Sequence, residues 1–399
     1  MLSRTCSIPL AGWARSTLST SALLVLALSC RGDEGNEGDP SQTSEVGTFS
    51  GRFDNVVTGF NFPFDIAIAP GKPHPDDAEE DPEAADDLIA PGVIVVANYG
   101  TSELMLAGDP TDEGGGQARS LLDGTSVDLR GATAVSMTPD RFVWGTFEQG
   151  GEGDGGAIVV LEPVEGRRVQ LLDGTLDRDA FRNPAGVCFG GAIEDDEGNQ
   201  AEWFWFFVNL GDGTAWRVNA RDTMGTDPSL TRVGGGLAIG TPGRPGSPGN
   251  EITSSNDLPQ DGARGCAFHD GNLYVADAQN ARIVRFDRAH DGRDLEPVVL
   301  EDTPPELVTY PTDVTVNSEG VLIVISYDNA HAFVTLELPY GGFLDNGLHD
   351  LNVNSGNYGT AVASETIWFT RANNKNGSLR AITPDHDHTP ETYEPFFPQ

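Results

Sequence analysis

The sequence is poor in cysteine and in basic side chains, and each shortage excludes a class of function. Four cysteines occur in 399 residues, and none forms a Cys-x-x-Cys or a haem-attachment motif. Redox catalysis and structural zinc binding therefore have no support. Lysine and arginine total 24 against 61 aspartates and glutamates, which gives a net charge of −37. A field this negative repels nucleic acid and anionic membrane surfaces, so we expect neither as a partner.

The sequence also has no hydrophobic run long enough to cross a membrane. The apolar run at residues 22–28 follows two arginines and leads to small residues before Cys30. This pattern predicts a secretory signal over residues 1–29. The junction resembles the bacterial lipobox, which implies that Cys30 is acylated and anchors an exported protein in the cell envelope, at the outer membrane or the periplasmic side. An ordinary signal peptidase could cut the same bond, and both interpretations stay open.

Composition predicts the character of the remaining segments. Residues 30–46 are rich in glycine, acidic residues and serine, and we interpret them as an acidic, flexible tether. The folded body is expected at 47–384 and a C-terminal tail at 385–399. Forty-nine glycines and 26 prolines among short apolar runs favour an all-β fold with many turns.

Residues 262–287, GARGCAFHDGNLYVADAQNARIVRFD, show the architecture most clearly. Three short apolar runs alternate with turns, and Asp270-Gly271 is a strong hairpin pattern. The stretch resembles the NHL repeat, one blade of a β-propeller, and residues 265–286 match that repeat nearly position by position. The resemblance implies that the chain is built from such blades.

The same pattern recurs along the chain. An anchor of the form x-x-x-[Gly/Asp/Ala]-hydrophobic ends at Ile66, Val135, Val187, Cys266, Val314 and Val362, and the last two gaps are 48 residues each. Each anchor is followed by a second and a third apolar run, whereas fourth strands are clear only at 169–172 and 297–300. This periodicity predicts an all-β, six-bladed β-propeller of four-stranded antiparallel blades. We expect an N-terminal strand at 47–57 to close the sixth blade, because an open ring would expose two sheet edges.

Three polar stretches interrupt the pattern. The acidic run at 71–88 is predicted to be a solvated loop, since it lacks the spaced ligands of a calcium loop. Residues 219–260 are predicted to be a functional lid or a disordered insertion. The tail sequence Asp385-His386-Asp387-His388 is expected to be solvated.

In an antiparallel blade, the start of the first strand and the end of the second strand lie on one face. The residues in these two columns form the predicted ligand-binding funnel: Arg130, Arg182, Arg264, Arg371, Tyr310, Tyr358, Asn98, Asn209 and Asp277. Four arginines in so acidic a chain indicate an acidic ligand, such as a carboxylate-bearing glycan, a peptide or a protein loop. The alternative is that each arginine caps a turn or pairs with a neighbouring acid, for instance Asp261 beside Arg264.

Enzymatic interpretations find less support. Resemblance to amidating lyases would require histidine ligands in the funnel, but His269, His331 and His349 fall in turns and linkers. Resemblance to calcium-dependent lactonases would use Asn98, Asn209 and Asp277, but no glutamate stands in either column. We therefore expect a monomeric binding or scaffold module with no obligatory cofactor, Ca²⁺ being possible. The alternative is a metal-dependent hydrolase or lyase that uses the channel.

Cys188 and Cys266 fall in the inner strands of neighbouring blades. Packed sheets stand about 10 Å apart, whereas a disulfide needs Cα atoms within about 7 Å. We therefore predict two buried free thiols.

Overall fold

The computed structural model describes residues 54–70, 93–107, 118–122, 128–152, 155–162, 167–194, 200–210, 212–236, 262–300, 302, 308, 310–327, 333–347, 357–363, 366–372 and 377–382. All of them belong to one unit, Val46–Gln399. The signal segment, Cys30, the acidic run at 71–88 and the tail at 385–399 lie outside the described residues. No helix in the described part of the chain has the length and apolar content needed to cross a membrane.

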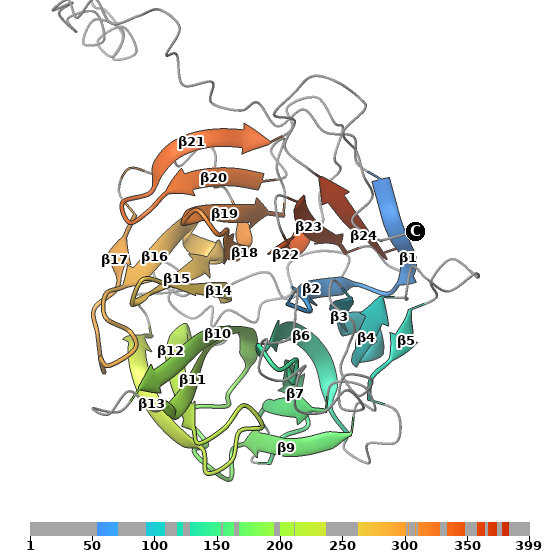
Figure 1. The fold of residues 1–399 in the computed structure, drawn as a ribbon, viewed down its shortest axis with the longest axis vertical. Coiled ribbons are helices and arrows are strands. Elements are labelled where there is room, and N and C mark those ends of the chain that lie inside the picture. Colours follow the sequence, from blue (N-terminus) through green and yellow to red (C-terminus); the bar gives the residue numbers. More distant parts are fainter. Residues whose placement is uncertain are drawn as a thin grey trace, which may run out of the picture. The chain divides into compact units, whose positions relative to one another are not determined.

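Six four-stranded antiparallel sheets form the blades of a β-propeller (Figure 1). The inner strands are β2 (Pro63–Ile68), β6 (Arg130–Met137), β10 (Pro184–Glu194), β14 (Ala263–His269), β18 (Pro311–Val316) and β22 (Asn357–Ala363). The second strands are β3 (Ile94–Asn98), β7 (Val143–Gln149), β11 (Gln200–Asn209), β15 (Asn272–Asp277), β19 (Val321–Ser326) and β23 (Thr366–Arg371). The third strands are β4 (Glu103–Ala107), β8 (Ala157–Leu161), β12 (Thr214–Ala220), β16 (Arg282–Phe286), β20 (Phe333–Glu337) and β24 (Gly377–Ile382). The outer strands are β5 (Arg119–Ser120), β9 (Arg168–Asp173), β13 (Ser229–Gly235), β17 (Val298–Val299), β21 (Gly342–Gly347) and β1 (Asp54–Phe60).

The inner strands close a ring. Each of them contacts the inner strand of both neighbouring blades, in the order β2, β6, β10, β14, β18, β22 and back to β2. All six predicted anchors lie in these strands, because each anchor carries the short apolar run that the crowded centre of the ring requires. The predicted six-bladed fold is confirmed.

The sixth blade is completed from the N-terminal side, as predicted. Strand β1 pairs antiparallel with β24, with Val57 opposite Leu379 and Phe60 opposite Gly377. The strand begins and ends later than the predicted 47–57. Joining the two ends of the chain in one sheet removes the edges that an open ring would expose.

The hairpin predicted at Asp270-Gly271 is also present. His269 pairs with Asn272, and the two residues between them have φ of 47° and 79°. Two consecutive positive φ angles are typical of a type I′ turn, whose twist matches that of the flanking strands.

Three outer strands escaped the sequence analysis: β5, β13 and β21. Strand β13 corrects the expectation for residues 219–260, because the first part of that stretch completes β12 and forms the outer strand of the third blade. Its polar sequence, SLTRVGG, has little apolar alternation, since an outer strand buries less of its surface than an inner one. Residues 237–261 lie outside the described residues.

The hydrophobic core lies between the blades. The indole rings of Trp144 and Trp205, from the second and third blades, stack with centroids 3.9 Å apart. Phe181 and Phe207 stack beside them at 5.2 Å. Each fully buried aromatic side chain contributes roughly 1.5–3 kcal/mol by leaving water. These contacts hold the inner strands in fixed positions around the channel.

Candidate functional site

The central channel has two different ends. The inner strands all start at the end we call the funnel end, where the predicted arginine and tyrosine residues lie. The C-terminal halves of the same strands line a solvent-open cavity of 260 Å³ at the other end, which we call the chamber. The two ends carry different chemistry.

At the funnel end, Arg264 extends across the channel. It is the second residue of β14 and is only 5% exposed. Its guanidinium carbon lies 5.9 Å from the ring centre of Phe64 and 5.4 Å from that of Tyr358. The side chain thus reaches from the fourth blade to the first and sixth, where it makes cation–π contacts with both rings.

Aromatic rings surround this guanidinium. Phe64 stacks on Tyr99 and on Tyr358, with both centroid distances 4.4 Å. Tyr99 reaches the stack because β3 is followed by a single 3₁₀ turn, η3 (Tyr99–Thr101). Tyr327 packs edge-on against Tyr358 at 5.3 Å and lies 6.0 Å from Tyr310. The predicted pair Tyr310 and Tyr358 is thus joined through a third tyrosine that the sequence analysis did not single out.

Glu148 is the acidic member of the same group. It lies in β7 and is buried, and its Oε2 accepts a hydrogen bond of 3.0 Å from the Tyr99 hydroxyl. Burial raises the pKa of Glu148, while the Tyr99 hydrogen bond and the charge of Arg264 oppose the rise. The two predicted columns hold no glutamate, but Glu148 reaches the funnel end from a position two residues beyond the column. Strand β7 runs to Gln149, beyond the predicted end of its apolar run, and the alternation of its sequence continues to Glu148.

Several buried polar atoms in this region have no hydrogen-bonding partner among the described residues. They are Nε and Nη2 of Arg264, the Tyr358 hydroxyl, Oε1 of Glu148, Oγ of Ser326, both side-chain amide atoms of Asn357 and Nε of Arg371. Asn357 and Arg371 face each other across the β22–β23 pair. Leaving one such atom unsatisfied costs about 1–3 kcal/mol, more for a charged group. We name Arg264, Phe64, Tyr99, Glu148, Tyr327 and Tyr358 the Arg264 cluster.

The other two predicted arginines have a different environment. Arg130 is 64% exposed and pairs with Asp128 at 2.9 Å. Arg182 is 57% exposed and pairs with Asp179 at 2.7 Å. Both contacts match the alternative in which an arginine pairs with a neighbouring acid. Asp261, the acid suggested for Arg264, lies outside the described residues.

The two asparagines of the predicted second-strand column, Asn98 and Asn209, form hydrogen bonds that stabilise turns next to their strands. Asn98 Oδ1 accepts from the backbone N–H of Asn61 at 2.9 Å, and its Nδ2 donates to Thr101 at 2.7 Å. Asn209 donates to Thr214 Oγ1 at 2.9 Å. Both asparagine side chains are buried at the end of a second strand.

Asp277, the third buried member of that column, has charged and polar neighbours. It accepts hydrogen bonds from Asn280 Nδ2 at 2.8 and 2.9 Å and from Arg282 Nε at 2.7 Å. These bonds enclose a second 3₁₀ turn, η4 (Ala278–Asn280). Asp277 therefore lies on the predicted face, engaged with its own blade.

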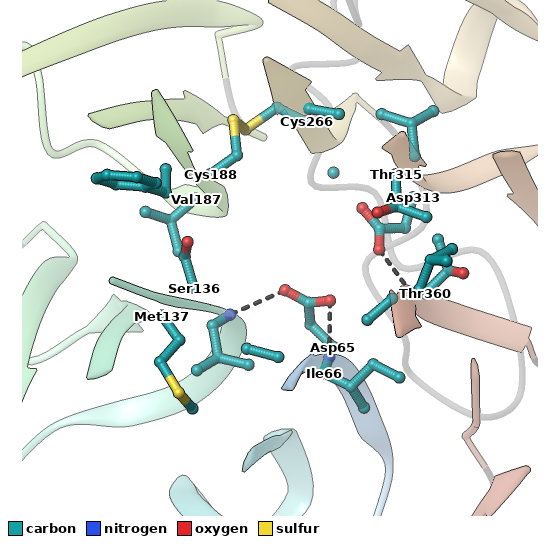
Figure 2. Close-up of a pocket in the computed structure, with 18 of the residues that line it drawn as sticks. Asp65, Ile66, Ser136, Met137, Val187, Cys188, Cys266, Asp313, Thr315 and Thr360 are labelled. Atoms are coloured by element: carbon teal, nitrogen blue, oxygen red, sulfur yellow. Dashed lines mark hydrogen bonds between the residues drawn. A yellow bond between two sulfur atoms is a disulfide. The ribbon is translucent and has the colours of Figure 1, made fainter. Parts of the chain in front are cut away.

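Asp65 and Asp313 project into the channel between the two ends (Figure 2). Their carboxyl groups interact electrostatically, and we call them the carboxyl pair. Asp65 Oδ2 accepts from the backbone N–H of Val135 at 2.8 Å, and Asp313 Oδ2 accepts from that of Thr360 at 2.7 Å. Neither aspartate was predicted as a site residue.

Burial is the largest influence on the pKa values of Asp65 and Asp313. It raises the pKa of Asp65 to about 7 and raises that of Asp313 well above its usual range. The charge of Asp65 raises the pKa of Asp313 further, because two close carboxylates repel each other. Both carboxyl groups therefore stay protonated to a higher pH than an ordinary aspartate.

A small cavity of 10 Å³, about the room for one water molecule, separates the carboxyl pair from Arg264 and Tyr358. The Arg264 cluster and the carboxyl pair therefore lie on opposite walls of the same narrow part of the channel.

Cys188 and Cys266 form a disulfide in the chamber wall (Figure 2). The prediction of two free thiols is wrong. Their Cα atoms are 5.8 Å apart, well inside the spacing of two stacked sheets. Neighbouring blades diverge outward from the axis, so their inner strands approach more closely than the sheets as a whole.

No protein-family model matches the sequence, and no curated protein matches it. Among solved structures, a gluconolactonase from Xanthomonas campestris has a TM-score of 0.51 at 13% identity, covering 85% of this chain and 92% of that one. Luciferin-regenerating enzyme has a TM-score of 0.48 at 12% identity, covering 84% and 95%. PQQ-bound aldose sugar dehydrogenase from Streptomyces coelicolor has a TM-score of 0.45 at 13% identity, covering 84% and 99%. At such identities the likeness shows the propeller fold alone. The NHL resemblance has no matching family model, and its residues fold as β14, β15 and β16.

Proposed function

We propose that this chain is an exported binding module of the bacterial cell envelope, anchored through Cys30, whose propeller holds a carboxylate-bearing ligand at the Arg264 cluster. The leader sequence and the tether support export. Arg264 supports the ligand class: its guanidinium is buried, flanked by aromatic rings, and two of its nitrogens lack partners among the described residues.

The chemistry of this cluster fits a carboxylate better than a neutral ligand. A buried cation without a hydrogen-bonded counter-charge is costly, and a planar guanidinium binds a carboxylate through two parallel hydrogen bonds. Tyr358 and Asn357 add a hydroxyl and an amide close by, suited to the hydroxyl groups of an acidic sugar. The rings of Phe64, Tyr99 and Tyr358 offer flat surface of the kind that sugars and peptides contact.

Arg130 and Arg182 belong to the same proposed face in a lesser role. Both are exposed and already paired, so their charges are screened by water and by their aspartates. They attract an anionic ligand without fixing its orientation. Arg371 contributes more, since its Nε is buried and faces Asn357 across the strand pair.

Calorimetric titration tests this proposal. D-galacturonate and D-galactose differ at one carbon, where a carboxylate replaces a hydroxymethyl group. We expect the acid to bind more tightly, and Arg264→Gln to weaken its binding at least tenfold, since a charged hydrogen bond contributes about 1.5–3 kcal/mol. Tyr358→Phe, which preserves the ring stack, should have a smaller effect. Equal binding of the two sugars, or an unchanged affinity in Arg264→Gln, would count against the proposal.

A metal-dependent hydrolase of the lactonase type remains the second candidate. The carboxyl pair favours it, because two neighbouring acids with raised pKa values are suited to acid–base chemistry. Elemental analysis of the purified protein separates the two candidates. One tightly held, stoichiometric metal ion would favour the hydrolase.

A further inference from the structure

The chamber plays no part in the proposed function. Its wall is formed by the C-terminal halves of all six inner strands, so it lies at the end of the channel away from the Arg264 cluster. Its volume of 260 Å³ is far larger than the 10 Å³ of the small cavity, which has room for about one water molecule. That is room for a small organic molecule, somewhat below drug size.

The titrating side chains in the described wall of the chamber are all acidic. Among the described residues that line the chamber, Asp65 and Asp313 are the only ones with a side chain that titrates. Ser136, Thr315 and Thr360 add hydroxyl groups. The inner strands are also sheet edges, which present both backbone N–H and carbonyl groups, so carbonyl acceptors join these side chains. The deep end of the chamber is therefore rich in hydrogen-bond acceptors.

The carboxyl pair is not needed to join the blades. Each aspartate does bind a backbone N–H of the next blade, which could be a purely structural role. The corresponding positions in the other four blades are Ala134, Gly186, Gly265 and Ala361, and the ring closes there without any carboxylate. Conversely, each carboxylate oxygen can accept two hydrogen bonds, so the backbone contacts leave acceptor capacity toward the chamber.

Gly265 makes room for this arrangement. A Cβ atom at position 265 would lie 1.7 Å from Asp313 Oδ1. The fourth blade therefore carries no side chain at the point where the fifth blade's carboxyl group enters the channel.

We propose that the chamber is a second binding site, which takes a small organic cation with its primary ammonium group against Asp65 and Asp313. A primary ammonium group has three donors and no acceptor, which matches a wall of carboxylate, hydroxyl and carbonyl oxygens. The strongly acidic protein also raises the local concentration of cations, not of anions. The proposal does not rest on the proposed function, although Arg264 lies across the small cavity from the carboxyl pair.

The site has a defined pH dependence. The charged groups around Asp65 are Asp313 on β18 and, across the small cavity, Arg264 on β14. Strand β22 contributes the Tyr358 hydroxyl, whose pKa burial raises, and the described lining from β6 and β10 has no titrating side chain. Near pH 8, above the raised pKa of Asp65, the pair carries negative charge. As the pH falls through about 7 this charge is lost, since the pKa of Asp65 is raised to about 7. Ammonium binding should weaken over the same range.

Titration of the mature protein with n-butylammonium, n-butanol and butyrate tests the site with three probes of one size and three charges. We expect saturable binding of n-butylammonium near pH 8, at least tenfold weaker binding of the other two, and at least tenfold weaker n-butylammonium binding near pH 5.5. Asp65→Asn should reduce n-butylammonium affinity at least tenfold. Asp270→Asn makes the same chemical change at an exposed turn and should have no effect.

Four results would overturn the proposal. The first is no saturable binding of n-butylammonium up to about 10 mM, and the second is an equal affinity for n-butanol. The third is an n-butylammonium affinity in Asp65→Asn within twofold of the native value. The fourth is a loss of n-butylammonium affinity in Asp270→Asn as large as the loss in Asp65→Asn. The comparison of two pH values uses the native protein and so holds even if Asp65→Asn fails to fold. Arg264→Gln should leave n-butylammonium binding in place, which separates this site from the proposed carboxylate site.

Discussion

The Cys188–Cys266 disulfide should contribute a large share of the propeller's stability. It closes a loop with a sequence separation of 78 and joins the third blade to the fourth at the centre of the ring. In the chain-entropy relation, a loop of this length removes about 15 cal/mol/K from the unfolded state, or about 4.5 kcal/mol at 25 °C. The double variant Cys188→Ala/Cys266→Ala should lose about that amount, plus a smaller cost for the sulfur atoms removed from the chamber wall.

Urea denaturation with and without a thiol reductant measures this effect. The unfolding entropy of a body of roughly 330 residues, at about 2.1 cal/mol/K per residue, is about 0.7 kcal/mol/K, so the loss corresponds to about 6 °C in Tm. Reductant should lower the native midpoint toward that of the variant and leave the variant unchanged. A difference below about 1 kcal/mol, or a variant that responds to reductant as the native protein does, would refute the reasoning.

The remaining predictions concern the channel and the N-terminus. The pKa of Asp65 is about 7 in the folded protein and an ordinary 3.8 in the unfolded chain, so between those pH values the folded protein holds a proton that the unfolded chain releases. The free energy of unfolding should therefore fall as the pH rises through this range. Asp65→Asn should flatten this fall in denaturation experiments, and an unchanged slope would contradict the reasoning. Gly265→Ala should destabilise the protein by roughly 1–3 kcal/mol, since its new Cβ meets Asp313, and thermal unfolding would show no shift if the aspartate could simply move aside. Cys30→Ala should move the protein from the membrane fraction to the soluble fraction on sedimentation, whereas continued membrane association would exclude acylation at Cys30 as the anchor.

Much of the fold could be predicted because a propeller repeats one local pattern. Anchors such as Ile66 and Val314 recur at the start of every blade, and each is followed by two apolar runs that must pair with it. Closure by β1 followed from the cost of an exposed edge. The outer strands β5 and β13 could not be found in this way, since they bury too little surface to impose alternation on their sequences. The sequence of β21, GFLDNG, has no apolar alternation either.

The site was harder to predict because its geometry depends on the ring. Arg130 and Arg182 precede their anchors by five residues and lie on the exposed rim, whereas Arg264 precedes Cys266 by two and enters the channel. Asp65 and Asp313 stand in the Gly/Asp/Ala position of the anchor pattern, where each looks like a turn-forming residue. Only the closed ring brings the first and fifth blades face to face.

The disulfide was missed for a related reason. Blade spacing was taken from stacked sheets, which are parallel over their whole width, whereas Cys188 and Cys266 lie where the blades converge. Glu148 was missed because its strand continues past the apolar run. An alternation test carried three residues further, from Gly145 to Glu148, would have found it.

The most direct test of the proposed function compares the affinity of three proteins for D-galacturonate. They are the native mature protein, the Arg264→Gln variant and the Arg221→Gln variant. Arg221 is an exposed arginine paired with Asp227 after β12, away from the funnel end, and so controls for the loss of one positive charge. The account expects at least a tenfold loss in Arg264→Gln and no change in Arg221→Gln. Equal affinities in all three proteins, with the fold intact, would show that the Arg264 cluster does not bind the acid.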